Sequence, residues 1–66
     1  MKVYINGSVK EIGSVRTVAE LLDQLRIPVS AALIEQNGNV IARHEFRTAA
    51  VTEGDAIEIV QMVAGG

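Results

Sequence analysis

The sequence predicts an α+β domain in which a mixed β-sheet packs on one main helix. Three observations support this prediction: an Asn6-Gly7 hairpin signal, an amphipathic helical segment that begins at Thr17, and a final alternating strand from Ala56 to Val60. With two short strands and a loop between the helix and the last strand, the order of elements is ββαβββ. No linker or repeat interrupts this order, so we expect residues 1–66 to form a single domain.

The first two strands are predicted from the alternation on both sides of Asn6-Gly7. Val3 and Ile5 fall on one side of the first strand, and Tyr4 falls on the other. A type I′ turn needs positive φ at both of its central residues, and Asn-Gly is the pair that adopts it most readily. Residues 8–12 are therefore expected to return antiparallel to residues 2–6.

The helix is predicted from its start signal and its apolar period. Thr17 and Glu20 have the spacing of a capping box, in which each side chain accepts a hydrogen bond from the other residue's backbone N–H. Pro28 is expected to stop the helix after about three turns. The residues that form its apolar stripe, which we expect in the core, are Val18, Leu21, Leu22 and Leu25.

The second half of the chain reads as short strands separated by turns. Strands are expected at 31–36 and 40–42 around an Asn37-Gly38-Asn39 turn, and residues 43–51 are expected as a loop with one helical turn. A further turn at Glu53-Gly54-Asp55 precedes the last strand, and we assign Asp55 to turn chemistry. A helix crossing one face of a mixed sheet, with the last strand parallel to the first, is the β-grasp or ubiquitin-like arrangement.

Composition excludes several classes of function. The 66 residues carry a net charge of −2 without a basic face, so nucleic-acid binding is not expected. No cysteine is present and His44 is the single histidine, so a zinc site lacks ligands. We expect a cytoplasmic protein without a membrane span, and a core too small and too aliphatic to hold the pocket of an independent enzyme.

The C-terminal sequence resembles a known family. The run from Gly54-Asp55 through Ile57-Glu58-Ile59-Val60 to Val63-Ala64-Gly65-Gly66 is similar to the end of the ThiS family, the sulfur carriers of thiamine biosynthesis. Asn6-Gly7, the Thr17-Val18 helix start with Leu21-Leu22, and Asn37-Gly38 followed by Val40-Ile41 resemble the same family. The resemblance covers essentially the whole chain.

The resemblance implies a carrier that does no chemistry of its own. Gly66 would be the site of sulfur attachment, first as an acyl-adenylate and then as a thiocarboxylate. Residues 61–66 would be a flexible tail, and Met62, Val63, Ala64 and Gly65 would thread into a partner. Glycine lacks a Cβ, so a tail that ends in two glycines can enter a narrow channel.

The resemblance also implies partners. They are an adenylating enzyme of the ThiF or MoeB type, which uses ATP and Mg²⁺, a sulfur donor such as a cysteine desulfurase, and a thiazole synthase of the ThiG type. No cofactor is expected on the carrier itself. Alternation along the last strand places Glu58, Val60 and Met62 on the sheet face away from the helix, with Tyr4 beside them if the first and last strands pair. Two interpretations of this face stay open: a docking surface, or a solvated face that carries scattered apolar residues.

Three alternatives remain open at this level. The chain could carry sulfur for another pathway, such as molybdopterin synthesis. It could be a ubiquitin-like modifier that joins Gly66 to lysines of other proteins. It could also be an inert interaction module that ends in two glycines by chance.

Overall fold

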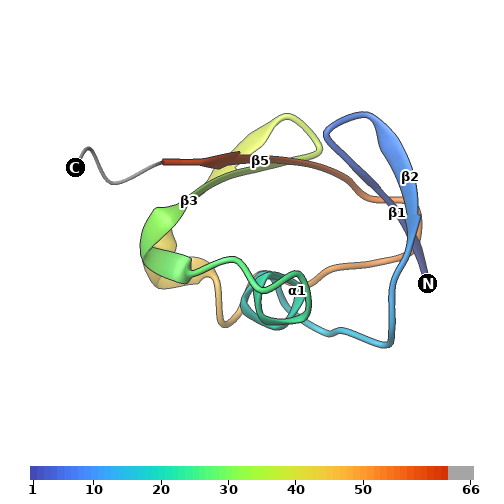
Figure 1. The fold of residues 1–66 in the computed structure, drawn as a ribbon, viewed down its shortest axis with the longest axis horizontal. Coiled ribbons are helices and arrows are strands. Elements are labelled where there is room, and N and C mark those ends of the chain that lie inside the picture. Colours follow the sequence, from blue (N-terminus) through green and yellow to red (C-terminus); the bar gives the residue numbers. More distant parts are fainter. Residues whose placement is uncertain (63–66) are drawn as a thin grey trace.

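The computed structural model describes residues 1–62 as one sheet laid over one α-helix (Figure 1). The order of the strands in the sheet is β2-β1-β5-β3-β4. β1 and β5 pair in parallel and the other neighbours pair antiparallel, which confirms the predicted mixed sheet. The elements are β1 (Lys2–Ile5), β2 (Ser8–Glu11), α1 (Val18–Gln24), the 3₁₀ turn η1 (Val29–Ala31), β3 (Ala32–Gln36), β4 (Asn39–Ile41), the 3₁₀ turn η2 (Arg43–Glu45) and β5 (Ala56–Gln61).

Two tight turns of the same kind close the two hairpins of the sheet. Asn6 and Asn37 both have φ of 51°, and Gly7 and Gly38 both have φ of 84°. Two successive residues with positive φ make the type I′ turn, whose twist matches that of the flanking strands. The first hairpin is thus confirmed, whereas the second turn is one residue shorter than predicted because Asn39 already belongs to β4.

The start of α1 follows the prediction except at one hydrogen bond. Thr17 is the N-cap, and its Oγ1 accepts a hydrogen bond from the Glu20 N–H at 3.3 Å. The Glu20 carboxylate accepts from the Arg16 N–H at 2.8 Å, not from Thr17 as predicted. Thr17 itself lies extended and forms a β-bridge with Ala50, which ties the start of the helix to the segment before β5.

The helix ends one turn earlier than predicted. Arg26 adopts the left-handed conformation, with φ of 60°, so Pro28 is not the residue that stops α1. The Ile27 N–H donates to the Leu22 carbonyl at 2.9 Å and the Arg26 N–H donates to the Asp23 carbonyl at 3.0 Å. These two bonds form a Schellman motif, which satisfies the last carbonyls of the helix.

The core lies between α1 and one face of the sheet. The predicted stripe is buried at Val18, Leu21 and Leu22, all with no exposed surface, while Leu25 at the C-cap is half-buried. Phe46, which follows η2, is 2% exposed and is among the largest fully buried side chains. η2 is the helical turn predicted within the loop of residues 43–51. Phe46, from the same loop, adds an aromatic ring to a core that we expected to be aliphatic.

β5 is longer than predicted. It runs through Gln61, and the Met62 N–H donates to the Ala31 carbonyl at 2.7 Å. Residues 61 and 62 therefore belong to the paired part of the chain and not to the predicted tail, because β3 and η1 extend far enough to hold them. Residues 63–66 lie outside the described residues.

Candidate functional site

The sheet face away from α1 carries a concentration of exposed hydrophobic side chains. Strand register places six large ones on this face, which we call the open face. They come from all five strands and from the residue that follows β5. Tyr4 lies beside Val9 on β2 and Ala56 at the start of β5, whereas Leu33 lies beside Val60 near the end of β5. These residues are Tyr4, Val9, Leu33, Val40, Val60 and Met62.

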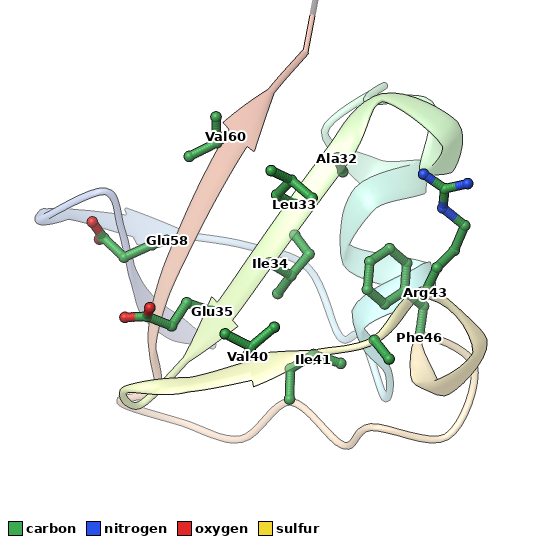
Figure 2. Close-up of a pocket in the computed structure, with 11 residues that line it drawn as sticks. Ala32, Leu33, Ile34, Glu35, Val40, Ile41, Arg43, Phe46, Glu58 and Val60 are labelled. Atoms are coloured by element: carbon green, nitrogen blue, oxygen red, sulfur yellow. The ribbon is translucent and has the colours of Figure 1, made fainter.

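A groove of about 540 Å³ lies at the β3–β4 side of the open face. Leu33 and Val60 are direct neighbours across β3 and β5, and Val40 on β4 is the direct neighbour of Glu35 on β3 (Figure 2). The Phe46 ring and Arg43 line the side where the chain leaves β4 for η2. The groove is lined both by exposed residues of the open face and by the buried residues Ala32, Ile34 and Phe46.

Two glutamates on the same face lie directly opposite each other. Glu35 on β3 and Glu58 on β5 are register partners, and both line the groove. Figure 2 shows their carboxylates projecting from adjacent strands on the same side of the sheet. Within residues 1–62 neither carboxylate forms an ion pair or a hydrogen bond. Like charges directly opposite in a sheet destabilise it, so this pair is an uncompensated cost to the fold.

The strand that leads toward the C-terminus is held firmly by its neighbours. β1 pairs with β5 only at two positions before the chain turns away at Asn6. The Asn6 side chain then continues the ladder, because its Oδ1 accepts from the Ile59 N–H at 2.7 Å and its Nδ2 donates to the Ile59 carbonyl at 3.1 Å. The Asn6 side chain thus makes the hydrogen bonds that a further residue of β1 would make. β5 is therefore hydrogen-bonded on both edges up to Ile59, by β1 and Asn6 on one side and by β3 on the other.

A buried carboxylate anchors the start of β5. Asp55 is 8% exposed and accepts hydrogen bonds from the Thr52 N–H and hydroxyl, the Gln36 amide and the Asn37 amide, at 2.8 to 3.1 Å. Burial raises the pKa of Asp55, and the hydrogen bonds from Thr52, Asn37 and Gln36 together outweigh that effect and hold the pKa below its ordinary value. Asp55 therefore has the turn role that was predicted for it.

The predicted site residues fall into two groups. Tyr4, Glu58, Val60 and Met62 lie on the open face, as alternation predicted, with exposed fractions of 44%, 57% and 48% for Tyr4, Val60 and Met62. Their role in docking stays a prediction. The predicted attachment site Gly66 and the threading residues Val63, Ala64 and Gly65 lie outside the described residues.

Sequence reasoning missed four residues of the open face. One is Val9 on β2, and the other three are Leu33, Glu35 and Val40, which line the groove beside Glu58 and Val60. Alternation along β3 was the signal that could have found two of them: Ala32 and Ile34 are buried, so Leu33 and Glu35 lie on the opposite, open face. That signal becomes readable only when β3 is known to lie next to β5.

Comparison with known proteins identifies the family. The model of the ThiS family matches residues 3–66. The sulfur carrier protein ThiS of Escherichia coli is 30% identical over the full length of both chains. A thiazole synthase of Paramagnetospirillum magneticum is 32% identical over all 66 residues, and the chain spans 20% of the length of that relative.

Solved structures agree with these matches. The crystal structure of a thiamine biosynthesis protein, ThiS, from Geobacter metallireducens superposes with a TM-score of 0.83 at 30% identity, and each chain is covered completely. An NMR structure from the same organism gives a TM-score of 0.82 and is covered over 88% of its length. The predicted β-grasp fold is thereby confirmed, and the chain belongs to the ThiS family.

Proposed function

We propose that this chain is the sulfur carrier of thiamine thiazole synthesis and that the carboxylate of Gly66 is the group that carries the sulfur. The observation that supports the proposal most strongly is the match over the complete length of the Escherichia coli sulfur carrier. The C-terminal Val63-Ala64-Gly65-Gly66 sequence adds to it. The chain is a carrier and not a catalyst.

The chemistry requires activation by a partner, because a carboxylate is a poor acyl donor. In an adenylating enzyme, a Gly66 carboxylate oxygen attacks the α-phosphorus of ATP and pyrophosphate leaves, which gives an acyl-adenylate. A sulfide equivalent from a sulfur donor then attacks the acyl carbon, the C–O bond to AMP breaks, and loss of a proton leaves the thiocarboxylate on Gly66. ATP, Mg²⁺ and catalysis belong to the partner, whereas the carrier contributes a positioned, unhindered terminus.

The fold supports this division of roles. β5 lies in the middle of the sheet and is held by β1 and the Asn6 side chain on one edge and by β3 on the other. Its last paired residues, Gln61 and Met62, directly precede the four C-terminal residues. A partner that takes up Gly66 therefore approaches this end of the sheet, and the open face around Tyr4, Glu58, Val60 and Met62 is the docking surface we assign to both the adenylating enzyme and the sulfur acceptor.

The acceptor is proposed to be a thiazole synthase. A relative of that name contains a segment similar to this entire chain, so carrier and synthase occur there in one polypeptide. Such a fusion places the carrier at high effective concentration near the synthase, which is advantageous when one must deliver a group to the other.

Intact-mass spectrometry tests the proposal. The purified chain is incubated with its adenylating enzyme, Mg-ATP and a sulfur donor, and we expect a gain in mass equal to the exchange of one oxygen for one sulfur. Omission of ATP is the control. If no such species forms with any adenylating enzyme of the same organism, the sulfur-carrier function is wrong for this chain.

A further inference from the structure

The open-face groove is apolar in its floor and acidic at one end. Leu33, Val40 and Val60 supply the apolar surface, with exposed fractions of 53%, 79% and 57%. Glu35 and Glu58 stand together where the groove reaches the centre of the sheet. These apolar side chains bury little surface in the isolated domain, so they contribute little to its stability. The glutamate pair lowers that stability, because like charges lie directly opposite each other.

The cation nearest in the groove is committed elsewhere. Arg43 lines the groove, but its guanidinium donates to the Ser30 carbonyl at 3.2 Å. Both ion pairs within residues 1–62 involve other carboxylates, those of Glu11 and Glu20. The two groove carboxylates thus have no cation from the described part of their own chain.

A second copy of the chain does not complement this surface. A symmetric dimer through the open face brings the same patch of each copy into one interface, so that interface would contain both glutamate pairs. Such a contact adds like-charge repulsion to the repulsion already present within each pair. The surface instead matches a partner that brings positive charge together with apolar area.

We propose that the groove binds an arginine side chain of a partner protein, with the guanidinium between Glu35 and Glu58 and the aliphatic stem over Leu33 and Val60. A guanidinium is planar and presents several N–H donors, so it can bond two carboxylates at once, whereas an ammonium is a point charge. The stem of arginine packs along apolar surface while its charged end bonds. The proposal rests on the proposed function to the extent that the partner is the adenylating enzyme which takes up Gly66.

Titration calorimetry with the purified adenylating enzyme of the same organism tests the proposal. Glu35→Gln and Glu58→Gln should each raise the Kd at least about tenfold at low salt, because each removes one carboxylate from a desolvated charge contact. Asp23→Asn is the matched control, because it removes one negative charge from an exposed position of α1, and it should leave the Kd within about twofold. The Kd of the wild-type chain should also rise with salt more steeply than that of the double Gln variant.

Each outcome of the titration either supports or overturns the proposed arginine site. Wild-type affinity in the double Gln variant overturns the proposal, and so does a failure of the wild-type chain to bind the enzyme. A dimer of the chain alone that Leu33→Glu abolishes assigns the groove to a second copy and also overturns it. Thermal melts should show the Gln variants at least as stable as wild type, which separates lost binding from lost folding. Charge-dependent binding without conversion of Gly66 would support the arginine site while overturning the sulfur-carrier function.

Discussion

At the scale of single residues, Asp55 connects parts of the chain that are far apart in sequence. Its carboxylate receives donors from Thr52, from Gln36 at the end of β3 and from Asn37 in the β3–β4 turn. Asn37 in turn accepts from the Ala56 N–H at 2.9 Å. One buried carboxylate therefore fixes where β5 begins relative to β3, and so fixes the register that places Glu58 opposite Glu35.

Asp55→Asn should destabilise the fold by about 2–3 kcal/mol. An amide offers one acceptor oxygen where the carboxylate offers two, so its NH₂ group would face donors that are left unpaired. Urea unfolding at neutral pH measures the change. Asp23→Asn makes the same chemical change on the exposed surface of α1 and should cost less than about 0.5 kcal/mol. Equal stability of Asp55→Asn and wild type would show that the network contributes nothing.

The same carboxylate should make stability depend on acidity. Because the folded pKa of Asp55 lies below its ordinary value of 3.8, ionised Asp55 stabilises the fold above that pH, and the contribution is lost as pH falls through the folded pKa. The stability difference between wild type and Asp55→Asn should therefore narrow as pH is lowered below 3.8. Urea titrations over this range measure the difference, and a gap that widens in acid would contradict the assignment.

Tyr4 is the one aromatic side chain on the open face, since Phe46 is buried. Tyr4→Ala should weaken binding to the adenylating enzyme by about 2 kcal/mol, because buried aromatic anchors often dominate the energy of an interface. Its melting temperature should change little, since the residue is 44% exposed in the free chain. Tyr4→Phe, which keeps the ring, is the control. Unchanged affinity in Tyr4→Ala would place docking on another surface.

At the scale of elements, α1 ends at a residue that is poorly suited to the conformation it adopts. Arg26 occupies the left-handed position of the Schellman motif, which most often holds glycine. A side chain with a Cβ in this conformation costs about 1–2 kcal/mol relative to the right-handed form. The hydrogen bonds of Ile27 and Arg26 to the end of the helix are what hold the strained residue in place.

Arg26→Gly should therefore stabilise the domain, by up to about 1 kcal/mol. Relief of strain at the left-handed residue favours the fold, while the added freedom of glycine in the unfolded chain opposes it by about 0.4–1 kcal/mol. Thermal unfolding measures the net effect. The comparison variant is Asp23→Gly, inside α1, which should lower stability by about 0.3 kcal/mol, the difference in helix propensity between Asp and Gly. A loss of stability in Arg26→Gly would mean that the arginine side chain has contacts that outweigh the strain.

The elements also show where sequence reasoning succeeds. Asn6-Gly7, Thr17 and the alternation of Ile57 and Ile59 are local signals, and each predicted its element correctly. The end of α1 was predicted wrongly because Leu25 continues the apolar period, and nothing in the sequence marks Arg26 as left-handed. Local signals predict elements well when the physical cause is itself local.

Features that depend on strand pairing were harder to predict. Phe46 enters the core from a segment without a period, so its burial becomes visible only in three dimensions. The groove and the Glu35–Glu58 pair require β3 to lie next to β5, a contact between segments about twenty residues apart. For the candidate site, the sequence could therefore predict which face of β5 is open but not what stands beside it.

At the scale of the whole molecule, the chain separates stability from function. Within residues 1–62, the buried hydrophobic side chains lie on the helix side of the sheet, while the opposite face carries six exposed hydrophobic residues and an unpaired acidic pair. No helix among these residues is long and apolar enough to cross a membrane. The domain therefore folds with one face and exposes the other, which is the face we propose as the docking surface.

Deletion of Gly66 tests this separation directly. Residues 1–62 already contain the described core and sheet hydrogen bonds that hold β5, so deletion of the terminal residue should leave the melting temperature unchanged within about 1 °C. Conversion to the thiocarboxylate should fall below detection by intact mass, because the acyl group then lies one residue, about 3.5 Å, short of the α-phosphorus. Such a shortfall removes the near-attack geometry on which activation depends. Binding to the adenylating enzyme should persist within about tenfold, since the open face is intact, and titration of the deletion variant measures it. A variant that unfolds would make the C-terminal residues structural, and one that is still converted would move the reactive group away from Gly66.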